Sequence, residues 1–120
     1  MKKYIIISCG AMIGAVSRYA IALSLAAVTP FFFTATLVVN LLGAFGIGFI
    51  FQKLVARNPL WHDFLITGLL GSFTTFSLLT YENYMLVEVG DLLALSIYLA
   101  INLFGGFMLA FLGMKSGGAS

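Results

Sequence analysis

The sequence predicts an all-α membrane protein with four transmembrane helices, and three observations lead to that fold class. Of its 120 residues, 62% are hydrophobic and only 8% are charged, whereas a soluble domain carries roughly 25% charged residues. Four apolar segments stand out, at 4–28, 31–51, 64–87 and 92–114, and each can supply the ~20 residues that cross a hydrocarbon core. Because little sequence lies outside these segments, we expect residues 1–120 to form a single four-helix transmembrane domain.

The basic residues predict the orientation of this domain. Apart from Arg18, every Lys and Arg falls on one side of a four-helix topology: Lys2, Lys3, Lys53, Arg57 and Lys115. The two connections on the other side, 29–30 and 88–91, carry neither residue type. Cytoplasmic segments carry an excess of Lys and Arg, so we expect both termini and the middle loop, 52–63, to be cytoplasmic. The tail, 115–120, is short and rich in Gly and Ser, and we expect it to be disordered.

Polar residues inside the first two segments are candidate site residues. Gly10, Gly14 and Arg18 recur every four residues, so the arginine shares a helix face with glycines that allow close helix approach. Its side chain either snorkels to the outer headgroups or, as we favour, faces protein and attracts an anion. Asn40, in the second segment, is either an interhelical hydrogen-bonding group or an amide donor to an anion.

The third segment predicts a broken helix. Its stretch 71–77 combines a glycine with several hydroxyl residues at mid-membrane depth, where unpaired backbone groups find no water. This composition indicates either close packing through small residues or a break whose free carbonyls face an ion site. Glu82, which lies further along the same segment, is either a vestibule gate or an interfacial charge. From the end of this stretch onward, hydroxyl groups recur at helical spacing on one face, at Ser77, Thr80, Tyr81 and Tyr84.

Three motifs together resemble one family of membrane proteins. The first segment reads Gly-Ala-Met-Ile-Gly-Ala-Val-Ser-Arg-Tyr at 10–19, and the second reads Thr-Leu-Val-Val-Asn-Leu-Leu-Gly at 36–43. The third reads Gly-Ser-Phe-Thr-Thr-Phe-Ser at 71–77. In this order and at this spacing, the motifs resemble the bacterial fluoride channel family known as Fluc or CrcB, and the resemblance covers all four segments.

The resemblance implies an antiparallel, dual-topology dimer with fluoride pathways along the subunit interface. The breaks in the two third helices would meet at its centre, where backbone carbonyls of Gly71 and Thr74 would hold a structural sodium ion that is not transported. Hard cations take oxygen ligands, and unwound carbonyls supply them. The resemblance also places a set of residues along the fluoride pathway: Asn40, Phe76, Ser77, Thr75, Thr80, Arg18 and Glu82.

Two leucines depart from the family pattern. The pattern reads Phe-Ser-Thr-Phe after the break, whereas this chain has Phe76, Ser77, Leu78 and Leu79. An aromatic ring offers a positive edge to an anion, and leucine offers neither such an edge nor a donor. The departure therefore bears on the pore that these positions would line, and it does not bear on the fold or the sodium site.

The resulting functional prediction is a passive fluoride-selective channel subunit, not an enzyme. It would export fluoride across a bacterial plasma membrane and so protect the cell against fluoride toxicity. One alternative is a partner subunit of a heterodimer with one degraded pore, which the one-sided basic residues and Leu79 favour over a homodimer. Another is a small multidrug proton-coupled antiporter, which would need a carboxylate in the first segment, and this segment has none.

Overall fold

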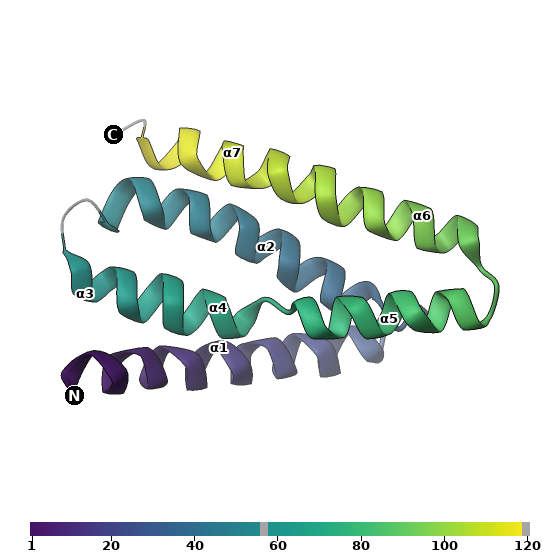
Figure 1. The fold of residues 1–120 in the computed structure, drawn as a ribbon, viewed down its shortest axis with the longest axis horizontal. Coiled ribbons are helices and arrows are strands. Elements are labelled where there is room, and N and C mark those ends of the chain that lie inside the picture. Colours follow the sequence, from purple (N-terminus) through teal and green to yellow (C-terminus); the bar gives the residue numbers. More distant parts are fainter. Residues whose placement is uncertain (56–57, 119–120) are drawn as a thin grey trace.

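Four helical spans form the structure, a computed structural model that describes residues 1–55 and 58–118. The spans are Lys2–Ala26, Thr34–Leu54, Pro59–Glu88 and Leu92–Gly118, each long and apolar enough to cross a membrane. They run along the longest dimension, 48 Å, and the N-terminus lies at the same end as the C-terminal turn of the fourth span (Figure 1). The predicted all-α membrane fold with four spans and a broken third helix is confirmed. The predicted dimer stays a prediction.

Several helical elements make up each span after the first. The first span is α1 (Lys2–Ala26), and the second joins α2 (Thr34–Ile50) to the wider, π-type turns of η1 (Phe51–Val55). The third span consists of α3 (Pro59–Trp61), η2 (His62–Leu70), α4 (Gly71–Phe73) and α5 (Phe76–Glu88). The fourth consists of α6 (Leu92–Ala100), η3 (Ile101–Gly105) and α7 (Gly106–Gly118).

The ends of the second, third and fourth spans differ from the sequence-based expectation. Helix continues through Val55 and resumes at Pro59, so the middle connection is much shorter than 52–63, and Arg57 lies outside the described residues. Asn58 begins α3 because its side chain accepts a hydrogen bond from the Leu60 N–H at 2.9 Å, as an N-cap does. The expected disorder from residue 115 is wrong as far as Gly118, since Gly117 is buried against the Phe49 carbonyl.

Two glycine-lined seams hold the spans together, and neither joins consecutive spans. Helix α1 packs along η2 and α4, while α2 packs along α7. In the first seam, a Cβ on Gly10 or Gly14 would collide with the backbone carbonyls of Phe64 or Leu69. In the second seam, a Cβ on Gly113 would collide with the backbone of Phe45. Small residues thus let two pairs of backbones touch directly, which is how helices gain packing energy in lipid.

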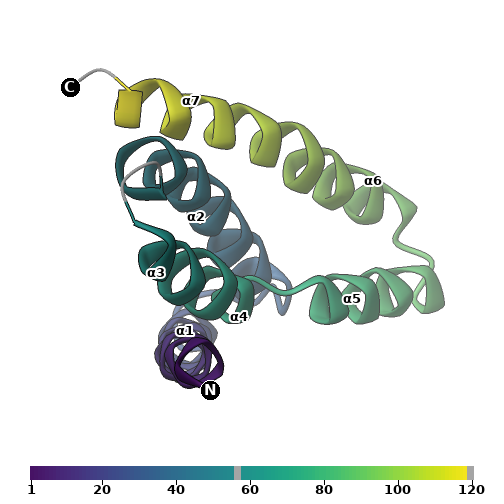
Figure 2. The same cartoon turned by 60° about the vertical axis from the view of Figure 1, so that its left-hand side comes forward.

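The α5–α6 hairpin stands apart from the other helices. In Figure 2, α5 and α6 extend away from α1, α2 and α4. Their connection is a tight turn in which Gly90 adopts a positive φ of 75°, and Asp91 N–H bonds back to the Leu86 carbonyl at 3.0 Å, as in a Schellman motif. Among the described residues, large apolar side chains are exposed on every span, so lipid or another protein must cover them.

The second seam makes a testable prediction about stability. We expect Gly113→Ala to lower the free energy of unfolding by about 1–3 kcal/mol, since the new methyl overpacks a backbone contact. Gly106→Ala, in the same helix, is the matched control because no atom lies within 4 Å of a Cβ built there. Unfolding of both variants in detergent would be followed by circular dichroism. Equal stability of the two would show that α2 and α7 do not meet at Gly113.

Candidate functional site

The site is built around a two-residue break between α4 and α5. Thr74 (φ −79°, ψ 161°) and Thr75 (φ −147°, ψ 122°) are extended, so the helical hydrogen-bond ladder stops here. The break lies within the predicted stretch 71–77, while Gly71 itself is helical with φ −62° and ψ −28°. Thr75 restarts the helix as the N-cap of α5, where its Oγ1 accepts the Leu78 N–H at 3.1 Å. The sequence therefore supplies both an interruption and a new helix start.

Asn40 of α2 pairs with the interrupted backbone. Its Oδ1 accepts the Thr75 N–H at 2.8 Å, and its Nδ2 donates to the Thr75 carbonyl at 3.1 Å. One amide side chain thus satisfies both backbone groups of a single residue, which in lipid would otherwise have no partner. Of the two roles considered for Asn40, the interhelical one is present in the structure. We refer to this pair of hydrogen bonds as the Asn40–Thr75 clasp.

The Gly71 and Thr74 carbonyls are among the backbone carbonyls that the break leaves without their usual helical donors. In a continuous helix, the Gly71 carbonyl would accept from the Thr75 N–H and the Thr74 carbonyl would accept from the Leu78 N–H. Here Asn40 Oδ1 takes the first donor and Thr75 Oγ1 takes the second. These carbonyls are the two predicted to hold sodium, so their chemistry fits a hard cation that needs oxygen ligands.

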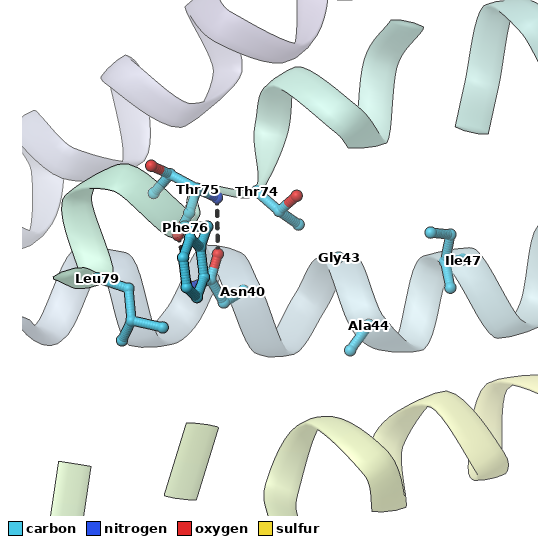
Figure 3. A pocket seen from close by; sticks show the side chains of 8 residues that line it. All are labelled: Asn40, Gly43, Ala44, Ile47, Thr74, Thr75, Phe76 and Leu79. Carbon is cyan, nitrogen blue, oxygen red and sulfur yellow. Dashed lines mark hydrogen bonds between the residues drawn. The ribbon is translucent and has the colours of Figure 1, made fainter. Parts of the chain in front are cut away.

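A first cavity, the Phe76 cavity, lies on one side of the clasp (Figure 3). Its volume is about 270 Å³. Phe76 begins α5 and places its ring beside Asn40, while Leu79 lies one turn further along α5. The Phe76 side chain is 80% exposed, so the subunit alone leaves this cavity open on one side. The complete lining consists of Asn40, Gly43, Ala44, Ile47, Thr74, Thr75, Phe76 and Leu79.

A second cavity, the Arg18 cavity, brings a cation and two hydroxyl groups together. It measures about 250 Å³, and Arg18, Thr75 and Ser77 contribute to its lining. The two hydroxyl oxygens lie 3.2 Å apart, and Thr75 Oγ1 also accepts the Leu78 N–H. Their mutual hydrogen bond uses only one of two hydroxyl protons, so one O–H can still donate to a bound group. Arg18 therefore contributes to the lining of this cavity, and its attraction of an anion there stays a prediction.

Glu82 is buried, and the structure contradicts its interpretation as an interfacial charge. Its side chain is 4% exposed, and one carboxylate oxygen accepts from Thr36 at 2.8 Å. The other accepts from the Tyr98 hydroxyl at 2.6 Å. The carboxylate also lines a third cavity of about 430 Å³, the Glu82 cavity, together with Thr36 and Leu78. The other interpretation, a vestibule gate, stays a prediction.

Sequence reasoning did not assign Thr36, Tyr98 or Asn102 to the site. Tyr98 and Asn102 extend the polar network, since Asn102 donates to the Tyr98 carbonyl at 2.9 Å and its Oδ1 lies 3.5 Å from Asn40 Nδ2. Sequence spacing could have indicated these residues, because Thr36 lies four residues before Asn40 and Tyr98 lies four residues before Asn102. Each pair occupies one helix face, and the two faces meet at Glu82 and the clasp.

The predicted hydroxyl stripe of α5 lies on its outer surface. Thr80 donates to the Phe76 carbonyl at 2.9 Å, so its hydroxyl proton is used within its own helix. Thr80, Tyr81 and Tyr84 are exposed, as are Phe76 and Ser77. The structure thus divides the predicted pathway residues between the surface of α5 and the three cavities around the clasp.

Known proteins are similar to this chain over most of its length. A family model described as CrcB-like protein, Camphor Resistance (CrcB), matches residues 5–114. The fluoride-specific ion channel FluC of Chlorobium chlorochromatii is 41% identical over 93% of this chain and 89% of its own length. Proteins of the same name from Sulfurihydrogenibium sp. and Thermotoga petrophila are 36% and 35% identical, each over 95% of this chain and over 95% and 93% of their own lengths.

The clasp predicts a specific pattern of stability changes. Asn40→Leu removes both hydrogen bonds to Thr75, and each backbone group left without a partner costs about 1–3 kcal/mol. Asn40→Gln keeps an amide that can still donate and accept, so we expect a smaller loss. Asn102→Leu is the control, since it removes only the 3.5 Å contact with Asn40 and one bond within its own helix. Denaturation in detergent would rank the variants, and an Asn40→Leu protein as stable as Asn102→Leu would contradict the clasp.

Proposed function

The chain belongs to the CrcB family, and from this membership and the cavities around the Asn40–Thr75 clasp we propose that it is a subunit of a passive, fluoride-selective channel. The single observation that carries the proposal is the Arg18 cavity, where a cation and a spare hydroxyl proton meet beside the broken helix. A cation inside a membrane protein attracts anions and marks an ion path.

A channel explains the site better than an enzyme or a proton-coupled antiporter does. The relatives are named as ion channels. Helix α1 contains no carboxylate that could exchange protons for a cationic substrate. Fluoride is a small, strongly hydrated anion, and hydroxyl donors and the positive edge of an aromatic ring can replace part of its water. Ser77 and Thr75 offer such donors, and Phe76 offers such an edge.

We further propose that a second four-helix subunit, inserted in the opposite orientation, covers the exposed face of α5. This face combines the Phe76 ring with the hydroxyl groups of Ser77, Thr80 and Tyr81. Hydroxyl groups and a ring that borders a cavity suit a protein partner better than they suit lipid tails. The open side of the Phe76 cavity would then be closed by the partner, and the pathway would run along the interface.

The basic residues support a bacterial plasma membrane location with both termini in the cytoplasm. Lys3, Lys53 and Lys115 lie on elements that meet at the same end of the bundle (Figure 1). If this asymmetry inserts every copy in one orientation, the inverted neighbour must come from a second gene. A heterodimer with one degraded pore, at Leu78 and Leu79, therefore remains the alternative to a homodimer. In either assembly the role would be fluoride export and resistance to fluoride.

A structural sodium ion at the centre of the dimer is also part of the proposal. The freed carbonyls of Gly71 and Thr74 would be its ligands, two from each subunit. Neutral carbonyls suit a hard cation in a low-dielectric site. Among residues 1–55 and 58–118, no group of three or more His, Cys, Asp or Glu is placed to hold a metal. The ion would join the two breaks and would not be transported.

Flux measurements in liposomes test the channel proposal. We expect the reconstituted protein to release fluoride down its gradient and to retain chloride, as a fluoride-selective channel would. Fluoride and chloride electrodes would follow efflux under a potassium gradient with valinomycin. Equal chloride efflux, or proton-driven export of a cationic dye, would contradict the proposal.

The same assay distinguishes the two assemblies. Efflux from liposomes that hold only this chain would support a homodimer. Efflux that requires co-expression with a second four-helix chain of opposite Lys/Arg bias would support a heterodimer.

Removal of sodium tests the proposed cation site. We expect replacement of Na⁺ by N-methylglucamine to lower the thermal stability of the dimer and to increase the monomer fraction, because the facing carbonyls would repel one another. Size-exclusion chromatography and thermal unfolding would measure both effects, with fluoride held constant. A dimer of unchanged stability without Na⁺ would argue against the site.

A further inference from the structure

Ser72 of α4 donates a hydrogen bond across the first glycine-lined seam. Its Oγ lies 2.5 Å from the Ala11 carbonyl of α1, and the bond joins residues that are 61 positions apart in the sequence. Both residues are half-buried. A carbonyl in the interior of a helix already has a helical donor, so this bond attaches α4 to α1 and is not needed to satisfy the Ala11 carbonyl.

The spacing of small residues places Ser72 on this seam. Gly68 and Ser72 lie four residues apart and therefore share a helix face. A Cβ on Gly68 would collide with the Ile7 carbonyl of α1, and a Cβ on Gly14 would collide with the Leu69 carbonyl. The two backbones are thus in direct contact, and a side chain as short as serine can reach a carbonyl of the neighbouring helix.

Ser72 also shares a peptide unit with one of the two proposed cation ligands. The Gly71 carbonyl carbon is bonded to the Ser72 nitrogen, just as the Thr74 carbonyl carbon is bonded to the Thr75 nitrogen, and each such unit is planar. Thr75 is held by α2 through the Asn40–Thr75 clasp, and Ser72 is held by α1. Each proposed ligand carbonyl is therefore followed directly by a residue that another span holds in place.

The Gly71 carbonyl needs such support because α4 ends at the break. The Thr74 N–H and Oγ1 both donate to the Leu70 carbonyl, at 3.0 and 2.9 Å, and close the last turn there. The next carbonyl, that of Gly71, has lost its helical donor to the clasp. A terminal turn whose carbonyls lack donors tends to fray. The bond from Ser72 to α1 restricts the movement of this turn.

We propose that Ser72 is a positioning residue for the cation site, because its hydrogen bond to the Ala11 carbonyl fixes the peptide unit that carries the Gly71 carbonyl. The inference rests on the structural sodium ion proposed above and adds a residue that does not touch the ion. Ser72 would act by keeping the Gly71 oxygen at a constant position relative to the Thr74 oxygen, so that less order has to be imposed when the ion binds.

Ser72→Ala removes only the hydroxyl group and is therefore the decisive variant. Alanine has a higher helix propensity than serine, so a weaker affinity for Na⁺ would not come from local melting of α4. Ser96→Ala is the matched control, since the Ser96 Oγ donates at 2.8 Å to the Leu92 carbonyl of its own helix. Gly113→Ala is a second control because it weakens the other glycine seam.

Unfolding at a series of Na⁺ concentrations tests the proposal, with N-methylglucamine keeping the ionic strength constant. An ion that binds the folded protein raises its stability with a concentration dependence set by the Kd. We expect Ser72→Ala to raise the Kd for Na⁺ severalfold. Ser96→Ala should keep the wild-type Kd, and so should Gly113→Ala, although Gly113→Ala should be less stable at every Na⁺ concentration.

The outcomes separate this inference from the sodium site itself. Wild-type stability that does not depend on Na⁺ would overturn the sodium site and this inference together. Wild-type dependence on Na⁺ with an unchanged Kd in Ser72→Ala would overturn this inference alone. An equal rise of the Kd in Gly113→Ala would also overturn it, since a general loss of packing would then explain the change.

Ser72→Cys keeps the test decisive should Ser72→Ala fail to fold. Cysteine has nearly the volume of serine and retains a weak S–H donor, so we expect a smaller rise of the Kd for Na⁺ than the loss of the hydroxyl would give. The titration would be run with a reducing agent, because Cys9 provides a second thiol in this variant. A wild-type Kd in Ser72→Cys, without a folded Ser72→Ala protein, would count against the positioning role.

Discussion

The hydrogen bonds between Asn40 and Thr75 are the constraint on which the rest of this structure depends. A membrane helix cannot open at mid-span unless other groups take over its backbone bonds. Here one side chain on the neighbouring span takes over both. Once the Thr75 N–H is held in this way, the Gly71 carbonyl loses its helical donor and α5 can begin at a new N-cap. The freed Gly71 carbonyl, the start of α5 and the division between the Phe76 cavity and the Arg18 cavity all follow from this one pairing.

The polar network around the break is continuous across three spans. Thr36 and Asn40 on α2, and Tyr98 and Asn102 on the fourth span, meet Glu82 and the clasp. Such a network is costly in lipid unless its members are satisfied. A carboxylate with a hydroxyl donor on each oxygen meets that condition without exposure to solvent. The network thus ties α5, which otherwise packs little against α2, to the body of the subunit.

Local patterns in the sequence predicted the fold and the kinds of residue in the site, but not their pairings. Hydropathy located four spans, and the Gly and Thr content of 71–77 located the break within a few residues. The partner of Thr75 could not be predicted from residues alone, because Asn40 lies 35 positions away and its amide could equally have faced an anion. The burial of Glu82 also depends on tertiary contacts, since its position near the end of an apolar segment is shared by many interfacial charges. The helical end of α7 from Lys115 to Gly118 includes a contact of Gly117 with Phe49 that no local propensity indicates.

The two glycine seams have a consequence for biosynthesis. Because α1 packs on the third span and α2 on the fourth, neither of the first two spans meets its tight-packing partner while only half of the chain has left the ribosome. The hairpin of the first two spans must therefore remain in the translocon or in lipid, with the glycine-containing faces of α1 and α2 not yet packed against a partner helix. Assembly then becomes a late event that requires the complete polypeptide, and a nascent chain that stalls before its fourth span would present an unpaired α2 to membrane quality control.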